Sequence, residues 1–284
     1  MKAAIIPNLT RDKALEVTYA VCRELEKNSI EYCFSSEIKE FIPDFSDCVF
    51  EEADSFIENA DIVISVGGDG SMLRAAKLAA NAGKNVLGIN AGRLAYLCGL
   101  DADEIHLLSY LKSRKYTIQR RMMLSVKVFK NDELIYSAQC LNDAVFTRGK
   151  SLRLIDLSVK TGGRDIADYL ADGAIFATPT GSTAYSMSAG GAIVEPTIDA
   201  ILLTPICPHS LAVRPFVFSG TSKFEISAKS NEDRNDVFLS CDGGEPIRIT
   251  ADCSVIIEKA DITASFIAIK TDNFIDVLNK KLEK

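Results

Sequence analysis

Residues 61–80 read DIVISVGGDGSMLRAAKLAA, and this stretch decides the fold class. Its first part, residues 62–66, is a short β-branched run typical of a strand buried on both faces of a parallel sheet. The glycines that follow end the strand, and the residues from Ser71 onward favour a helix. A second apolar run at residues 86–89 predicts the next strand. The pattern is that of a βαβ unit, so we expect an α/β domain with a parallel sheet.

The same alternation extends back to residue 3 and ends near residue 115. Residues 11–27 keep apolar side chains at helical spacing, whereas alternating runs beyond residue 115 are typical of antiparallel strands. We therefore predict two domains and a terminal helix. They are an α/β N-terminal Rossmann-like domain at residues 1–100, a mostly-β C-terminal domain at residues 101–270, and a helix at residues 271–284 that packs back on the N-terminal domain.

The composition excludes several classes of protein. The chain has 284 residues, 47% hydrophobic and 25% charged, as expected for a folded globular protein. Its formal net charge of -7 repels nucleic-acid backbones and anionic membrane surfaces. No apolar run reaches the roughly 18 residues of a membrane span, and the apolar run at the N-terminus is too short for a signal peptide. We expect no nucleic-acid partner and no membrane partner.

The eight cysteines are scattered along the chain without any Cys-x-x-Cys spacing. Only His106 and His209 could join them as metal ligands. We interpret the cysteines as reduced, mostly buried thiols of a cytoplasmic protein. No nucleophile motif accompanies His209, which we expect to be structural.

The segment Gly67-Gly68-Asp69-Gly70-Ser71 lies between the predicted strand and helix. Unpaired N–H groups and the helix dipole attract phosphate oxygens at such a point, and glycine lets a ligand approach the backbone closely. The segment is not a dinucleotide fingerprint, because Leu73 stands where GxGxxG requires its third glycine. A carboxylate repels phosphate, so Asp69 suggests a function: it accepts a hydroxyl proton during phosphoryl transfer or holds a divalent cation. Composition alone does not choose between these two roles.

A second unusual segment, residues 171–191, is crowded with hydroxyl side chains. A strand at residues 173–177 runs into a Pro-Thr-Gly turn and then into small polar residues. Such a surface suits a polyhydroxylated ligand, with Tyr185 available for stacking. A purely structural turn is the alternative.

Four motifs, in this order, resemble the NAD kinase family. They are GGDG at residues 67–70, Asn142-Asp143, Asp172-Gly173 and TPTGSTAYSMSAGG at residues 178–191. GGDG is shared with diacylglycerol and sphingosine kinases and with phosphofructokinases, whereas the TPTGSTAY block is peculiar to NAD kinases. The resemblance extends over most of residues 60–245, including residues 88–94 and 208–215.

The resemblance implies phosphoryl transfer from ATP to the 2′-hydroxyl of the adenosine ribose of NAD, giving NADP. It implies a divalent cation, usually Mg²⁺, and a homodimer or homotetramer. Residues 1–100 would then be the GGDG-kinase domain and residues 101–270 the NAD-binding domain. Asp69 would be the general base, with Asp69 and Gly70 also against NAD. The ATP phosphates would be approached by Gly67, Gly68 and Gly70.

The resemblance also implies which residues bind NAD. Asn142 would read the adenine edge, since a side-chain amide matches its donor and acceptor pair. Asp143 would take a ribose hydroxyl, and Asp172 would face the nicotinamide side. Taken locally, Asn142-Asp143 could equally be a hairpin turn. The adenosine pocket would be lined by Thr183, Ala184, Tyr185, Ser186 and Ser188. Arg74 and Arg153 stand where the family often has basic or polar ligand-contacting residues, with solvated surface arginines as the alternative.

The sequence departs from the family pattern at several positions. Asp143 replaces a frequent Glu, and Leu170 replaces a frequent Arg, a change that removes a cation near the dinucleotide. Residues 92–98 read GRLAYLC where GxLGFLT is usual, so Ala95 and Tyr96 alter the wall near the ligand. Gly243-Gly244 after Asp242 stands in place of the residues that often precede a Gln contact, and Asp242 is a candidate ligand.

Two alternative functions stay open at this stage. One is a GGDG-type kinase of a lipid or another small alcohol, which would predict an exposed apolar patch or acyl pocket. The other is a non-catalytic NAD-binding sensor, against which the presence of Asp69 argues. The sequence leaves undecided the choice between NAD and NADH, the use of polyphosphate, the metal and inhibition by NADP(H).

Overall fold

The computed structural model describes residues 1–10, 12–42, 48–53, 55–92, 95–149, 153–210, 212–229, 237–270 and 274–282. Arg93, Leu94 and Leu211, which belong to motifs of the family resemblance, lie outside these residues. The chain forms two compact units, one comprising residues 1–120 and 264–284 and the other residues 121–263. The assignment of phosphate binding to residues 1–100 and of NAD binding to residues 101–270 stays a prediction.

The first unit is built on a parallel sheet. Its strands are β1 (Lys2–Pro7), β2 (Glu31–Ser35), β3 (Val49–Glu51), β4 (Ile62–Gly67), β5 (Asn85–Asn90) and β6 (Leu100–Asp101). They lie in the order β3-β2-β1-β4-β5, with β6 and the end of β18 (Cys253–Ala268) pairing parallel to β5. The predicted βαβ unit is confirmed, and the six residues of β4 are all buried.

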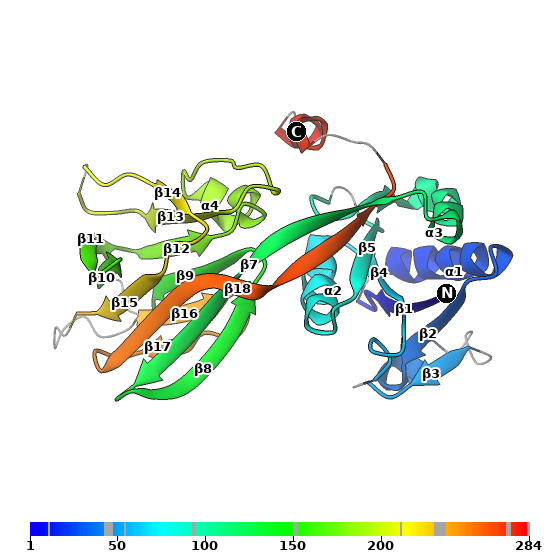
Figure 1. The fold of residues 1–284 in the computed structure, drawn as a ribbon, viewed down its shortest axis with the longest axis horizontal. Helices are drawn as coiled ribbons and strands as arrows, with labels where there is room; N and C mark the ends of the chain where they lie inside the picture. Colours follow the sequence, from blue (N-terminus) through cyan, green and yellow to red (C-terminus); the bar gives the residue numbers. More distant parts are fainter. Residues whose placement is uncertain are drawn as a thin grey trace. The chain divides into compact units, whose positions relative to one another are not determined.

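Helices cover both faces of this sheet (Figure 1). Helix α1 (Asp12–Lys27) packs with the 3-10 helix η3 (Ala102–Leu108) over the face that carries Leu87 and Ile89. Helix α2 (Asp69–Asn81) packs on the opposite face, where a Cβ on Gly88 would lie 2.7 Å from the Met72 sulfur. The unit also contains η1 (Ser36–Phe41), α3 (Ser109–Ser113) and α5 (Phe274–Leu282).

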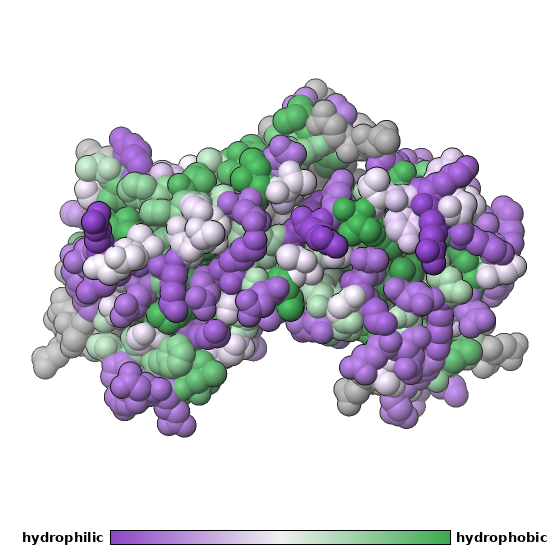
Figure 2. All heavy atoms as spheres, in the orientation of Figure 1, coloured by the Kyte–Doolittle hydropathy of each residue, from purple (hydrophilic) through white to green (hydrophobic). Residues whose placement is uncertain are grey.

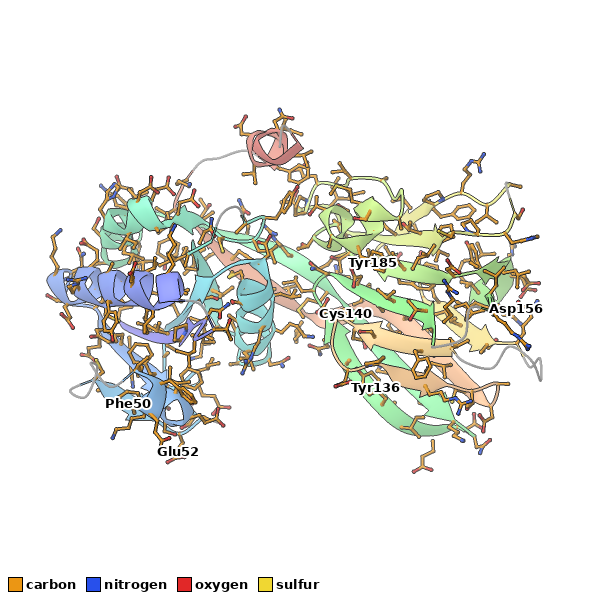
Figure 3. All side chains as sticks on the ribbon, turned by 180° about the vertical axis from the view of Figure 1, so that it is seen from behind. Phe50, Glu52, Tyr136, Cys140, Asp156 and Tyr185 are labelled. Carbon is orange, nitrogen blue, oxygen red and sulfur yellow. The ribbon has the colours of Figure 1, made fainter. Side chains whose placement is uncertain are left out.

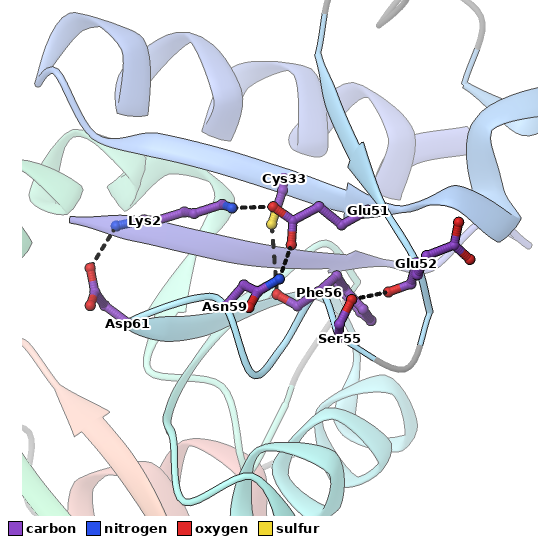
Figure 4. A network of polar contacts seen from close by, with 8 residues as sticks. All are labelled: Lys2, Cys33, Glu51, Glu52, Ser55, Phe56, Asn59 and Asp61. Atoms are coloured by element: carbon purple, nitrogen blue, oxygen red, sulfur yellow. Dashed lines mark hydrogen bonds and ion pairs between the residues drawn. The ribbon is translucent and has the colours of Figure 1, made fainter.

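A polar network ties β1 to its neighbours in this unit (Figure 4). Lys2 forms an ion pair with Glu51, and the Asn59 amide donates to the same carboxylate at 3.0 Å. The Lys2 main-chain N–H donates to Asp61 at 2.8 Å. The hydrogen bond from Lys2 holds the pKa of Glu51 below its usual range. These contacts serve the sheet, because they join β1, β3 and the segment before β4.

The second unit is a sandwich of two sheets, which confirms the mostly-β prediction. One sheet has the order β14-β13-β12-β9-β16-β17, and every pair in it is antiparallel. Its strands are β9 (Asp143–Arg148), β12 (Gly173–Ala177), β13 (Ala200–Ile206), β14 (Phe216–Ser219), β16 (Val237–Cys241) and β17 (Ile247–Ile249). The other sheet contains β7 (Thr117–Lys130), β8 (Glu133–Cys140), β10 (Ile155–Thr161), β11 (Arg164–Ala171), β15 (Phe224–Ala228) and most of β18.

The core of the second unit lies between its two sheets. Inward side chains from both sheets pack together, and Phe176 contacts Phe146 and Phe224 at ring-centroid distances of 6.0 and 5.2 Å. The short helices η4 (Gly181–Thr183) and α4 (Tyr185–Ser188) belong to the segment that follows β12. Ala189 and Val194 of that segment pack on Ile175 and Leu202, on the outer face of the sheet that contains β12 and β13. The hydroxyl-rich segment therefore covers the sheet that carries Asp143.

Strand β18 differs from expectation. The sequence predicts separate strands at residues 253–259 and 265–270, but residues 253–268 form one continuous strand. The intervening residues continue the extended backbone although Asp261 interrupts the apolar pattern. The chain leaves the first unit within β7 and returns to it within β18.

Candidate functional site

The glycine-rich segment lies at the carboxyl edge of the parallel sheet, where the strand order changes direction. From β1 the chain proceeds to β2 and β3 on one side, whereas β4 and β5 lie on the other. Ligands of open α/β sheets bind in the crevice at such a switch point. Gly67 ends β4, and Gly68 caps the helix that Asp69 begins. The first N–H groups of α2 have no partner within the helix and point toward this edge.

The three glycines of this segment serve different purposes. A Cβ on Gly67 would lie 2.5 Å from the Ser71 hydroxyl, which accepts a hydrogen bond of 2.9 Å from the Asn8 amide. Gly67 is therefore required by the packing of the protein itself. A Cβ on Gly68 or Gly70 would meet no atom within 4 Å, and neither backbone has a left-handed φ. The space beside Gly68 and Gly70 is left open, as a backbone that receives a phosphate requires.

The Asp69 carboxylate is held by the main chain of the segment after β5. Tyr96 N–H donates to Oδ2 and Leu97 N–H donates to Oδ1, each at 2.8 Å. These two donors offset the negative charge of the Asp69 carboxylate. The sequence does not signal this contact. An ionised carboxylate has about four acceptor positions, so Asp69 keeps acceptors for a further partner. Burial, together with the charge of Asp69, raises the pKa of Tyr96.

In the second unit, Asn142 and Asp143 lie where the chain crosses between the two sheets. Strand β8 ends at Cys140 in one sheet and β9 begins at Asp143 in the other, so the pair is not a hairpin turn. Asp143 is only 6% exposed. Burial and, to a lesser extent, the charge of Asp242 raise the pKa of Asp143 to about 7. The Asp143 carboxyl is therefore partly protonated at neutral pH.

The TPTG turn packs directly on this crossing. The Thr178 hydroxyl donates to the Leu141 carbonyl at 2.5 Å, and Thr178 N–H donates to the Asn142 carbonyl at 2.9 Å. A Cβ on Gly181 would overlap the Asn142 carbonyl oxygen, so only glycine fits there. The structure thus brings together two motifs that are about 40 residues apart in the sequence.

The predicted hydroxyls of residues 178–191 divide into two groups. Ser182 and Ser186 are fully buried; Ser182 bonds the main chain of Pro179 and Val194, and Ser186 pairs with Thr204 at 2.9 Å. Thr183 and Ala184 are partly exposed, Ser188 is exposed, and Tyr185 is 45% exposed on the surface (Figure 3). Part of the hydroxyl density therefore builds the fold, while the rest reaches the surface.

The remaining predicted residues lie at the surface or near it. Asp172 follows β11 and forms an ion pair with Arg148 at 3.0 Å, a partner that sequence reasoning missed. Leu170 accepts a hydrogen bond from His209 N–H, in keeping with a structural role for the segment around His209. Arg74 lies exposed on α2 and Arg153 is exposed in the second unit. The contacts of these residues with NAD stay predictions.

The described part of the chain contains no cluster of three or more His, Cys, Asp or Glu that could hold a metal ion. All eight cysteines are described, and all are free thiols, five of them buried. Among the described residues no helix is long and apolar enough to cross a membrane.

Comparison with known proteins identifies the family. The model of the ATP-NAD kinase N-terminal domain matches residues 3–109, and that of the C-terminal domain matches residues 141–269. The NAD kinases of Thermoanaerobacter sp. and Caldanaerobacter subterraneus are 37% and 36% identical to this chain, each over 99% of it and 98% of the relative.

Two solved structures share the fold. Yeast NADH kinase in complex with NADH has a TM-score of 0.91 and 26% identity, over 100% of this chain and 87% of the yeast chain. The NAD kinase of Archaeoglobus fulgidus in complex with ATP has a TM-score of 0.75 and 25% identity, over 100% of this chain and 99% of its own. These likenesses favour an NAD kinase and not a lipid kinase. With both domains of the family matched and relatives aligned over nearly their whole length, the chain belongs to the ATP-NAD kinase family.

Proposed function

We propose that this protein transfers the γ-phosphoryl group of ATP to the 2′-hydroxyl of the adenosine ribose of NAD. One observation carries the proposal beyond family membership. The loop at the switch point of the sheet contains two glycines, Gly68 and Gly70, that no packing or backbone conformation requires, and it holds Asp69 between them. The open glycines suit phosphate, and the oriented carboxylate suits a hydroxyl acceptor.

In the reaction, Gly67, Gly68 and Gly70 approach the ATP phosphates, and Asp69 with Gly70 lies against the ribose of NAD. The O2′–H proton passes to the Asp69 carboxylate, the O2′ lone pair forms the bond to Pγ, and the bond from Pγ to the β,γ-bridging oxygen breaks. The products are NADP and ADP. The transition state is loose, so Asp69 contributes mainly by orienting the hydroxyl. The N–H groups of Tyr96 and Leu97 fix that orientation.

The NAD-binding residues that we propose come mainly from the second unit. Asn142 reads the adenine edge, Asp143 takes a ribose hydroxyl and Asp172 faces the nicotinamide side. Their support is the assembly of the 141–143 crossing with the TPTG turn. The adenosine pocket that we propose consists of Thr183, Ala184, Tyr185, Ser186 and Ser188, with Arg74 and Arg153 as further contacts.

A divalent cation, Mg²⁺ by preference, fits the residues only as a partner shared with ATP. Mg²⁺ often takes one or two carboxylates together with substrate phosphates, and the partly exposed Asp69 offers one such ligand. When bound, the cation supplies charge neutralisation at the phosphates.

We also propose a cytoplasmic homodimer or homotetramer. Free thiols support a reducing compartment. Strand β14 is the edge of its sheet, and there Phe216 is 42% and Val217 54% exposed. Figure 2 shows apolar side chains gathered over β13, β14 and α4. An exposed apolar edge strand is a natural surface for pairing with a second copy.

The test is NADP formation from ATP, Mg²⁺ and NAD, followed with an NADP-specific dehydrogenase. Asp69→Asn loses the carboxylate but also presents an amide N–H₂ to a main-chain donor. Asp61→Asn is the matched control, because Asp61 likewise accepts a main-chain N–H in the first unit. Wild type and Asp61→Asn should form NADP, and Asp69→Asn should form very little. A folded wild type that binds NAD without consuming ATP would instead indicate a sensor.

A further inference from the structure

Asp242 lies at the end of β16 and faces the main chain of residues 141–143. Its backbone has a left-handed φ of +51°, and Gly243 follows with +69°. The Asp242 carboxylate accepts three consecutive N–H groups, from Leu141 at 2.9 Å, Asn142 at 2.8 Å and Asp143 at 3.1 Å. Successive N–H groups that converge on one anion form a strong local site, and here a side chain of the protein fills it.

The carbonyl groups of the same three residues are also satisfied. Thr178 bonds the carbonyls of Leu141 and Asn142, and Asp242 N–H donates to the Asp143 carbonyl at 2.9 Å. All six main-chain polar groups of residues 141–143 are therefore bonded by Asp242 and Thr178. The direction in which the Asn142 and Asp143 side chains leave the backbone depends on these two residues.

We propose that Asp242 is a positioning residue for NAD, acting through Asn142 and Asp143 rather than as a ligand. The proposal rests on the proposed function, in which those two side chains bind the dinucleotide. The Asp242 carboxylate is directed at the main chain of residues 141–143. By accepting its three N–H groups, the carboxylate fixes the conformation of this segment.

Asp242 also affects the charge of Asp143. The other titratable groups described near this acid pair are Tyr136, Cys140 and Cys241, of which Tyr136 and Cys140 are shown in Figure 3. Burial, with contributions from Cys241, Cys140 and Asp242, raises the pKa of Tyr136 above its ordinary value. The Tyr136 phenol is therefore neutral near pH 7, and Asp242 is the group whose charge contributes to the raised pKa of Asp143. Removing its charge should let Asp143 ionise at lower pH.

Two substitutions remove the Asp242 carboxylate without disturbing the left-handed backbone conformation. Glycine and asparagine both accept a left-handed φ, so Asp242→Gly and Asp242→Asn avoid backbone strain. Asp242→Gly removes all three accepted hydrogen bonds, whereas the Asn oxygen still accepts at the Oδ1 position, which Asn142 and Asp143 share. Asp132→Gly is the matched control, because Asp132 has a φ of +66° in the exposed β7–β8 turn.

The experiment measures steady-state kinetics and NAD binding by calorimetry for these variants, with circular dichroism as a check of folding. Asp242→Gly should raise KM and Kd for NAD by about tenfold or more, from the loss of charge-assisted hydrogen bonds, with KM for ATP unchanged. Asp242→Asn should show a smaller rise, and in both variants the inflection of kcat/KM for NAD should move to lower pH. Asp132→Gly should match wild type.

Unchanged NAD affinity in a folded Asp242→Gly would overturn the proposal, as would an equal loss of NAD and ATP affinity. If Asp242→Gly does not fold, Asp242→Asn decides by its pH profile and its KM for NAD. A wild type that binds NAD but forms no NADP would refute the proposed function, while the calorimetry would still test the positioning role.

Discussion

Replacing Gly70 by alanine should stabilise the protein and impair its activity. Gly70 is an exposed residue in the first turn of α2, and an added Cβ meets no protein atom within 4 Å. Alanine in a helix is favoured over glycine by about 0.5–1 kcal/mol. The midpoint of thermal unfolding should therefore rise by about 1–4 °C, from the usual relation for chains of this size. The gain arises because the methyl group finds only open space.

That open space is the one in which we place phosphate. A methyl group on Gly70 would hold a phosphate away from the N–H groups of the helix terminus. Loss of one charge-assisted hydrogen bond costs about 1.5–3 kcal/mol, so kcat/KM for ATP should fall by about ten- to a hundredfold. The assay is NADP formation at varied ATP and saturating NAD, beside thermal unfolding without ligands.

Asn81→Ala is the control, since it raises helix propensity at the other end of α2 and should leave activity unchanged. Full activity of Gly70→Ala with ATP would refute close approach of a ligand to this loop. A lower unfolding temperature together with lower activity would mean that the methyl group clashes with other atoms and that the space beside Gly70 is not open.

Three further predictions concern the second unit. The pKa of Asp143 is raised from 3.8 to about 7 in the folded chain, so the unfolded chain binds fewer protons between these pH values. Raising the pH from 4 to 7 should therefore lower the free energy of unfolding by up to about 4 kcal/mol. Asp143→Asn should remove this decline, so its urea midpoint should change less than that of wild type between pH 5 and pH 8; a parallel decline would contradict the assignment. Gly181→Ala should destabilise the unit by about 1–3 kcal/mol and raise KM for NAD, because its methyl group overlaps the Asn142 carbonyl oxygen; unchanged urea unfolding would speak against the packing described. Val217→Asp should lower the molar mass measured by light scattering, whereas Leu134→Asp on the edge strand β8, 51% exposed, should not; an unchanged mass of Val217→Asp would place the subunit contact elsewhere.

Features encoded by neighbouring residues could be predicted from the sequence. Strand β4, the glycine-rich turn and α2 follow from β-branching, glycine and helix propensity within about 20 residues. The family resemblance predicts that Asn142-Asp143 and the TPTGSTAY segment bind the same ligand. The TPTG turn packs on Asn142, and ligand binding by the two motifs stays a prediction.

Contacts between distant residues could not be predicted. The carboxylate of Asp242 bonds residues about 100 positions away, and the N–H groups that hold Asp69 come from a segment 27 and 28 positions further along the chain. Every residue except proline has a main-chain N–H, so the sequence does not indicate which of them donates to a distant side chain. The abundance of hydroxyls likewise did not reveal that Ser186 is buried against Thr204, because the partner hydroxyl lies 18 positions along the chain. Strand β18 is continuous through Asp261, where the apolar pattern is interrupted, so local apolarity alone does not predict its length.

The return of the chain to β5 sets an order of events during synthesis on the ribosome. Ser265 and Phe266 of β18 pair with Asn85 and Val86, so the parallel sheet lacks one of its strands until all of residues 121–263 have been made. At ordinary rates of translation that interval is about ten to thirty seconds. The β-sandwich, which includes most of β18, is complete only at the end of this time. Until then Asn85 and Val86 of β5 keep unpaired main-chain groups on the side that β18 later occupies. The first unit, although most of its residues emerge first, is the last to be completed.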